Sequence, residues 1–221
     1  MDPTAATLPL ALVAAGWILA APLVAHAVRV APWRRVIAGE AVHAWYGGIF
    51  CLIVLWSIQA TIGDTFTFHL LGVSAFTLAV GPALALAGAA LALALEIAVR
   101  GATWVNAGVA FVTMVAVPVA VTALVLRFAE RRLPPNFFVF VFVGAFFGAW
   151  LSYGAAALAG AAVLALGAFP SAATVFGEYA PYFLYLAFGE ATLTGMVITL
   201  AIVYRPQWIA TFDDARYLDG R

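Results

Sequence analysis

Apolar residues run almost without interruption along this chain of 221 residues, in stretches separated by short polar or charged segments. A helix of about 20 residues spans the roughly 30 Å hydrocarbon layer of a membrane, and the stretches have about that length. They predict seven segments: residues 8–28, 42–60, 68–80, 83–99, 102–126, 137–167 and 181–203. We therefore expect an all-α, polytopic integral membrane bundle of about seven transmembrane segments.

The apolar stretch from Phe66 to Val99 is too long for one crossing and contains a glycine followed by a proline at Gly81-Pro82. Proline lacks the helix N–H and crowds the preceding turn, so we expect two helices here instead of one. The first, residues 68–80, would extend only about 20 Å as a helix, short of the roughly 30 Å of hydrocarbon. The sequence therefore predicts one short or interrupted helix in the bundle.

Two internal features refine the segments that follow. Residues 83–99 contain Glu96, four positions before Arg100, and this spacing places both side chains on one helix face as a pair. Residues 102–126 contain Pro118, which predicts an interruption of that helix.

The charged residues of the loops predict the orientation in the membrane. Residues 29–35 and 127–135 each contain three arginines, whereas the loop TIGDT between them has Asp64 as its one charge. Loops rich in arginine stay in the cytoplasm, so the Asp64 loop should lie outside and residues 66–99 must cross twice. We expect a multi-pass protein of the bacterial inner membrane, with an external N-terminus and a cytoplasmic C-terminus.

The composition narrows the class of protein. Hydrophobic residues make up 66% of the chain and charged residues 9%, and the net charge is zero, which excludes a soluble globule and the basic surface of a nucleic-acid binder. The expected partners are the lipid bilayer and other membrane proteins. Cys51 is the one cysteine and predicts a packing role, with no intramolecular disulfide or thiolate metal cluster. No repeat or linker divides the chain, so we expect a single integral membrane domain over residues 1–221.

Polar side chains within apolar segments are candidates for function, because they are costly in hydrocarbon. His69 opens the short third segment; it is either a metal ligand or an interfacial hydrogen-bonding residue. Glu190 lies deep in the last segment and must be protonated, hydrogen-bonded or paired. It either makes a structural hydrogen bond, to a neighbouring helix backbone or to Asn106, or belongs to a polar transport path. We predict Glu190 and Asn106 as polar core residues.

The remaining candidates do not favour catalysis. His26 and His43 are expected at the cytoplasmic interface, His43 paired with Glu40, so the three histidines should not form one cluster. Ser74 and Ser152 lie in no recognisable nucleophile motif, and Walker-type glycine loops are absent from the sequence. We expect no enzyme and no covalently bound cofactor.

Several short motifs resemble one family of membrane proteins. They are the HLxG element at residues 69–72, the glycine-proline at 81–82, and the asparagine-glycine region at 106–108 followed by Met114. In this order and spacing the chain is similar to the CbiM/NikM-like proteins, the substrate-binding components of energy-coupling factor transporters for cobalt and nickel. The resemblance spans most of residues 60–218 and includes an uncharacterised bacterial branch of permeases.

The resemblance implies a fold, a site and partners. It implies a seven-helix bundle, an external N-terminus that plugs into it, and a divalent transition metal held by nitrogen ligands near the outer face. Characterised members begin Met-His-Ile-Pro-Asp-Gly and use the first residues together with the HLxG histidine. By this analogy the metal ligands are His69, the terminal amine of Met1 and Asp2, which stands where the family has histidine. Pro3 lacks an N–H, so the family's amine-and-amide chelate does not transfer unchanged.

Two functions follow from these features. The first is the substrate-binding subunit of an energy-coupling factor importer for a cobalt- or nickel-like cation, working with a transmembrane coupling protein and ATPase subunits on other chains. The alternative is a non-catalytic accessory or structural subunit of another membrane complex that has lost the metal site.

Overall fold

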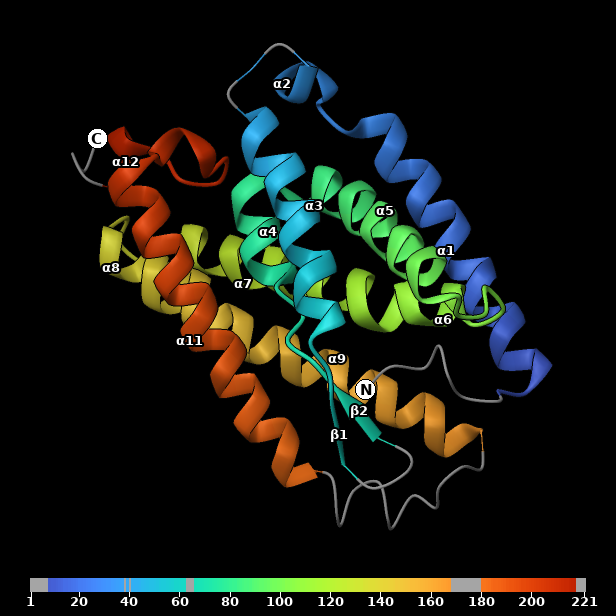
Figure 1. Ribbon diagram of the computed structural model, residues 1–221. Coiled ribbons are helices and arrows are strands. Elements are labelled where there is room, and N and C mark those ends of the chain that lie inside the picture. The colour runs from blue at the N-terminus through green and yellow to red at the C-terminus, as the bar shows by residue number, and fades with distance from the viewer. Residues whose placement is uncertain (1–7, 38, 40, 63–65, 168–179, 218–221) are drawn as a thin grey trace.

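The computed structural model describes residues 8–37, 39, 41–62, 66–167 and 180–217. The described chain is a bundle of helices with one short β-hairpin at an end (Figure 1). The predicted fold class, an all-helical polytopic bundle, is confirmed.

The described residues of the first half form five helices and the hairpin. Their bounds are α1 Leu10–Val30, α2 Trp33–Ile37, α3 Ala41–Ser57, β1 Ala60–Ile62, β2 Phe66–Phe68, α4 Val73–Val80 and α5 Pro82–Arg100. In the second half, α-helical and π-helical turns join into long continuous helices. The bounds here are α6 Ala107–Phe111, η2 Val112–Ala116, α7 Val117–Arg132, α8 Phe137–Val139, η3 Phe140–Phe147, α9 Gly148–Leu166, α11 Ala180–Tyr204, η5 Pro206–Trp208 and α12 Asp214–Tyr217.

Five helices in the described part of the chain are long and apolar enough to cross a bilayer. They are Leu10–Val30, Pro82–Arg100, Ala107–Arg132, Phe137–Leu166 and Tyr182–Tyr204. The apolar α3, which is shorter, and the short α4 stand at the positions of the other two predicted segments. Pro82 occupies the first turn of α5, where its missing N–H has no helical partner to lose, and the chain breaks there as predicted.

The third segment is shorter than predicted. Residues 66–68 form a strand paired antiparallel with residues 60–62, in a register that places Ala60 opposite Phe68. Helix α4 therefore begins only at Val73, and its eight residues extend about 12 Å. Residues between the hairpin and α4 run as irregular backbone into the bundle.

Two smaller predictions have different outcomes. The ion pair of Glu96 and Arg100 is present at 2.7 Å on α5. Cys51, predicted to pack inside, is exposed on α3, so that prediction is wrong. Its face of α3 points out of the bundle.

Pro118 is accommodated by the π-helical turn η2 just before it. There the N–H of Val117 donates to the carbonyl of Val112, five residues back. The wider turn absorbs the proline that a regular helix would exclude, and the helix continues through it.

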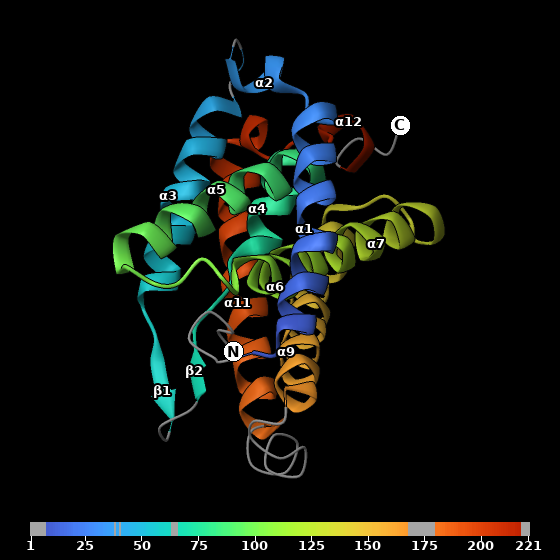
Figure 2. The same ribbon diagram turned by 90° about the vertical axis from the view of Figure 1, so that its right-hand side faces the viewer.

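The two ends of the bundle are distinct in both views. The hairpin, the end of α9 and the start of α11 lie at one end, and α2 and α12 lie at the other (Figures 1 and 2). At that second end, the Ala210 N–H donates to the Ala79 carbonyl at 2.6 Å. Arg216 donates to the Glu130 carbonyl at 2.9 Å. The segment after α11 thus covers the ends of α4 and α7.

Helices α1 and α6 pack with their backbones in near contact. A Cβ atom added at Gly108 would lie 2.7 Å from the backbone nitrogen of Trp17, and one at Gly16 would lie 2.6 Å from the backbone nitrogen of Val109. Small residues allow such an approach, as is common between helices in membranes.

We expect Gly108→Ala to lower the free energy of unfolding by roughly 1–3 kcal/mol, because a methyl group at this position must push α1 away from α6. The matched control is Gly47→Ala in α3, where an added Cβ meets nothing within 4 Å. Thermal unfolding of both variants in mild detergent measures the difference. Equal midpoints for the two variants would contradict the proposed backbone contact.

Candidate functional site

The four residues 69–72 form an irregular loop that joins β2 to α4. The side chain of His69 is buried there, with 4% of its surface exposed. Gly72, the N-cap of α4, has φ 67°, a left-handed conformation that glycine adopts without strain. The loop can therefore turn sharply into the helix and keep His69 inside the bundle.

The imidazole of His69 has a defined orientation. Its Nδ1 lies 3.1 Å from the carbonyl oxygen of Leu70, and the Trp56 ring packs beside it at a centroid distance of 6.4 Å. A carbonyl oxygen only accepts, so Nδ1 carries the proton and donates it. The lone pair of the neutral ring is then on Nε2, the form in which histidine binds metals.

Side chains from two helices hold the carbonyl groups of the loop. The indole Nε1 of Trp56 on α3 donates to the Leu71 carbonyl at 2.9 Å. The hydroxyl of Tyr153 on α9 donates to the His69 carbonyl at 3.3 Å. Neither residue was singled out from the sequence, because an aromatic residue in an apolar helix gives no local sign of a distant backbone partner.

Glu190 on α11 holds the N–H groups of the same loop. Its Oε2 accepts from the Leu71 N–H at 2.8 Å and its Oε1 accepts from the Gly72 N–H at 2.7 Å. The residue is 1% exposed, so its carboxylate is hydrogen-bonded in the interior. Of the alternatives open from the sequence, a hydrogen bond to backbone describes this geometry, although the backbone is that of the loop before α4.

Asn106, the other predicted site residue in the described part of the chain, lies on a different element. Asn106 is buried at the N-cap of α6, 2% exposed, in the turn after α5. Met1 and Asp2 lie outside the described residues. Within the described residues, no three side chains of His, Cys, Asp and Glu are grouped to hold a metal ion. The structure therefore brings together His69 and Glu190 through one loop and places Asn106 on another element.

The other two histidines lie at the opposite end of the bundle from this loop. His26 is exposed near the end of α1, and His43 is exposed at the start of α3, with its ring 6.4 Å from that of Trp208. Glu40, the predicted partner of His43, lies outside the described residues. Both histidines belong to the end of the bundle opposite the hairpin, so the three rings do not form one cluster, as predicted.

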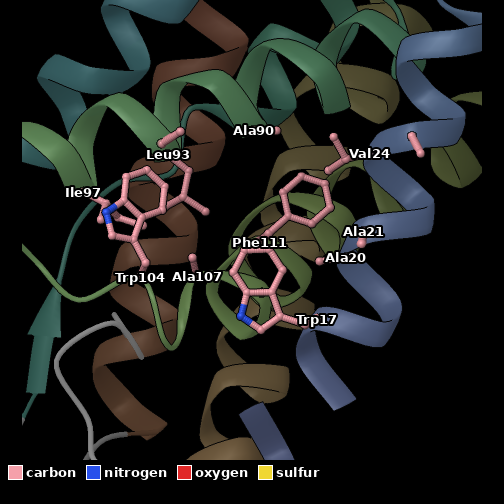
Figure 3. A pocket seen from close by; sticks show the side chains of 13 residues that line it. Trp17, Ala20, Ala21, Val24, Ala90, Leu93, Ile97, Trp104, Ala107 and Phe111 are labelled. Carbon is pink, nitrogen blue, oxygen red and sulfur yellow. The ribbon is translucent and has the colours of Figure 1, made fainter. Parts of the chain in front are cut away.

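A separate groove of about 370 Å³ lies between α1, α5 and α6 (Figure 3). Trp17, Trp104 and Phe111 line it together with alanine and leucine side chains. The Trp17 indole nitrogen donates to the Val105 carbonyl at 3.1 Å. The lining has apolar surface and no metal ligand, so the groove does not extend the site at His69.

Comparison with known proteins agrees with this architecture. The family model for the cobalt uptake substrate-specific transmembrane region matches residues 4–208. A solved structure described as the crystal structure of a transition metal transporter is similar in fold, with a TM-score of 0.73, 20% identity, and coverage of 87% of this chain and 88% of that chain. Comparison with curated proteins gave no match. The family resemblance inferred from the sequence is confirmed.

We expect Gly72→Ala to destabilise the protein more than Gly101→Ala. Both glycines have positive φ, 67° and 65°, so alanine costs about 1–2 kcal/mol at either position. An added Cβ at Gly72 also meets Leu55 Cδ1 at 2.7 Å, whereas one at Gly101 meets nothing within 4 Å. Thermal unfolding of the two variants isolates the packing of the loop, and equal losses would show that the loop is loosely packed.

Proposed function

This chain belongs to the family of cobalt uptake substrate-specific transmembrane regions, and we propose that it binds a divalent transition-metal cation at the loop of His69. As a member of this family it is the substrate-selecting membrane component of a transition-metal uptake transporter of the energy-coupling factor type, and it is not an enzyme. In the proposal, the cation is the substrate that passes through the protein.

The observation that supports the proposal is the state of the His69 ring. The ring is buried and its Nδ1 lies 3.1 Å from the Leu70 carbonyl oxygen, so Nε2 is the nitrogen that carries the lone pair when the ring is neutral. The loop that carries the ring is held by side chains from α3, α9 and α11. A ligand held in this way loses little conformational freedom when it binds a cation.

The other ligands in the proposal are the terminal amine of Met1 and the carboxylate of Asp2. An amine, a carboxylate and an imidazole form a mixed nitrogen and oxygen donor set, which suits cobalt, nickel, copper or zinc better than calcium or magnesium. This assignment rests on the position that the family's metal-binding N-terminus has in the sequence. It makes the cobalt- or nickel-like cation the substrate that we expect.

The positions of the arginines support the predicted orientation. Arginines lie on α2, near the ends of α1 and α7, and in the segment after α11, which contacts α7 through Arg216 and Glu130 and the start of α3 through Trp208 and His43. They are Arg29, Arg34, Arg35, Arg127, Arg131, Arg132, Arg205 and Arg216. Arg100, at the other end, is paired with Glu96. By the positive-inside rule the arginine-bearing end is cytoplasmic and the hairpin end is external.

The proposed partners act at the cytoplasmic end. The sequence contains no Walker-type phosphate loop, so ATP hydrolysis must come from other chains, with a transmembrane coupling protein between them and this subunit. The alternative, an accessory subunit that has lost its metal site, predicts recovery with a different membrane complex and without ATPases. Mass analysis of the protein purified in mild detergent distinguishes the two assemblies.

We expect His69→Ala to abolish metal binding while the protein stays folded, because the substitution removes a ligand but none of the loop's three supporting side chains. Calorimetric titration with nickel, cobalt, copper and zinc, on metal-free protein without a polyhistidine tag, measures the loss. The control His26→Ala removes an exposed histidine from α1 and should bind like the wild type. Unchanged binding in His69→Ala would overturn the proposed site.

We expect the two ends of the bundle to react from opposite sides of the membrane. On a Cys51→Ser background, Thr103→Cys places a single thiol in the exposed turn after α5, and Gln207→Cys places one in the exposed segment after α11. A membrane-impermeant maleimide applied to spheroplasts should label position 103 at once and position 207 only after permeabilisation. Labelling of both from one side would contradict the seven-segment topology, and the reversed pattern would contradict the orientation.

A further inference from the structure

One peptide group connects Glu190 to His69. The peptide between Leu70 and Leu71 accepts at its carbonyl from Nδ1 of His69, at 3.1 Å. The N–H of the same peptide donates to Oε2 of Glu190, at 2.8 Å. The atoms therefore form a continuous chain, from the imidazole N–H through the peptide to the carboxylate.

We propose that Glu190 is a positioning residue for His69, acting through the Leu70–Leu71 peptide to orient the imidazole and make it a stronger ligand. The inference rests on the proposed function for the value of that ligand, and on the two hydrogen bonds of the peptide for the connection itself. Metal-bound histidines usually donate their second N–H to a carboxylate or a carbonyl, which fixes the ring and raises its basicity. Here the His69 ring donates to the Leu70 carbonyl, and the same peptide donates to the carboxyl group of Glu190.

The physical effect comes from polarisation of the peptide. A carboxylate that accepts from a peptide N–H makes the carbonyl of that peptide a better acceptor, and hydrogen bonds in series strengthen one another in a low dielectric. The stronger acceptor pulls the Nδ1 proton of His69 and increases electron density at Nε2. The second oxygen of Glu190, at 2.7 Å from the Gly72 N–H, anchors the carboxylate so that it stays aligned.

The residue type follows from this geometry. Each of the two neighbouring N–H groups donates to its own oxygen, and a carboxyl group offers an acceptor on both. Glutamine of the same length offers one oxygen and one NH₂, so one N–H of the loop would face a second donor. Glu190→Gln is therefore the variant that disturbs the connection with the smallest change of shape.

The matched control holds the same loop without belonging to the connection. Tyr153→Phe removes the hydrogen bond to the His69 carbonyl, at 3.3 Å, and keeps the aromatic ring. A second control, Thr211→Val, removes the 2.7 Å hydrogen bond to the Leu78 carbonyl at the far end of α4. Both variants report the effect of loosening this region in general.

The first experiment titrates nickel and cobalt into metal-free wild type and the three variants. We expect Glu190→Gln to bind about 10- to 100-fold more weakly, with a shifted ligand-field band in the bound cobalt complex. Thr211→Val should remain within about threefold of the wild type. Tyr153→Phe should lose less affinity than Glu190→Gln and leave the ligand-field band unshifted, since it loosens the loop but leaves the connection intact. Equal losses in Glu190→Gln and Tyr153→Phe, or an unchanged affinity and band in Glu190→Gln, would overturn the proposal.

The second experiment needs neither metal nor a folded Glu190 variant. In metal-free wild type labelled with ¹⁵N-histidine, the ring signals of His69, assigned by their loss in His69→Ala, should show a neutral ring protonated at Nδ1. A ring protonated at Nε2 would overturn the inference even if Glu190→Gln failed to fold. If the wild type binds no metal, the proposed function fails, while this measurement still decides whether the connection exists.

Discussion

Two N–H groups of an irregular loop and one carboxylate form the interaction on which this structure depends. Backbone that is neither helix nor sheet is tolerated at membrane depth only where the protein satisfies its polar groups. Leu71 and Gly72 donate to Glu190, and each N–H left without a partner would cost several kcal/mol. The two N–H groups, in turn, give both oxygens of the buried Glu190 side chain a hydrogen-bond partner. The loop and the Glu190 side chain therefore stabilise each other, and the loop carries His69.

Helix α11 and the segment that follows it hold the short helix α4 at both of its ends. At the first end Glu190 of α11 binds the N–H groups of residues 71 and 72. At the other end Ala210 and Thr211, which follow α11, bind the carbonyls of Ala79 and Leu78. With only eight residues, α4 has little helical stability of its own and takes its position from these contacts. A shift of α11 relative to the bundle would consequently reach the His69 loop through α4 and through Glu190 alike.

Local rules predicted the parts of this structure that depend on neighbouring residues. Apolar length predicted the long helices, Pro82 the break before α5, and the spacing of Glu96 and Arg100 their ion pair. The hairpin was missed, because its two strands have three residues each and take their stability from pairing with one another. The cost of a carboxylate in hydrocarbon identified Glu190 as important, but its partners lie 118 and 119 positions away and leave no local pattern. For the same reason, no local sequence pattern identified Trp56 and Tyr153 as partners of the loop.

In the proposed site, the loop of His69 and the N-terminal residues meet two different requirements of a metal transporter. An imidazole nitrogen is a good ligand for cobalt, nickel, copper and zinc alike, so His69 can supply affinity but little discrimination among them. Discrimination must then come from the remaining donors and from the geometry that they impose. In the proposed ligand set those donors include Asp2 where the family has a histidine, and a carboxylate oxygen is harder than an imidazole nitrogen. In the proposed site, affinity and the identity of the preferred cation would therefore be set by different parts of the chain, and a change at residue 2 should alter selectivity without disturbing the connection between Glu190 and His69.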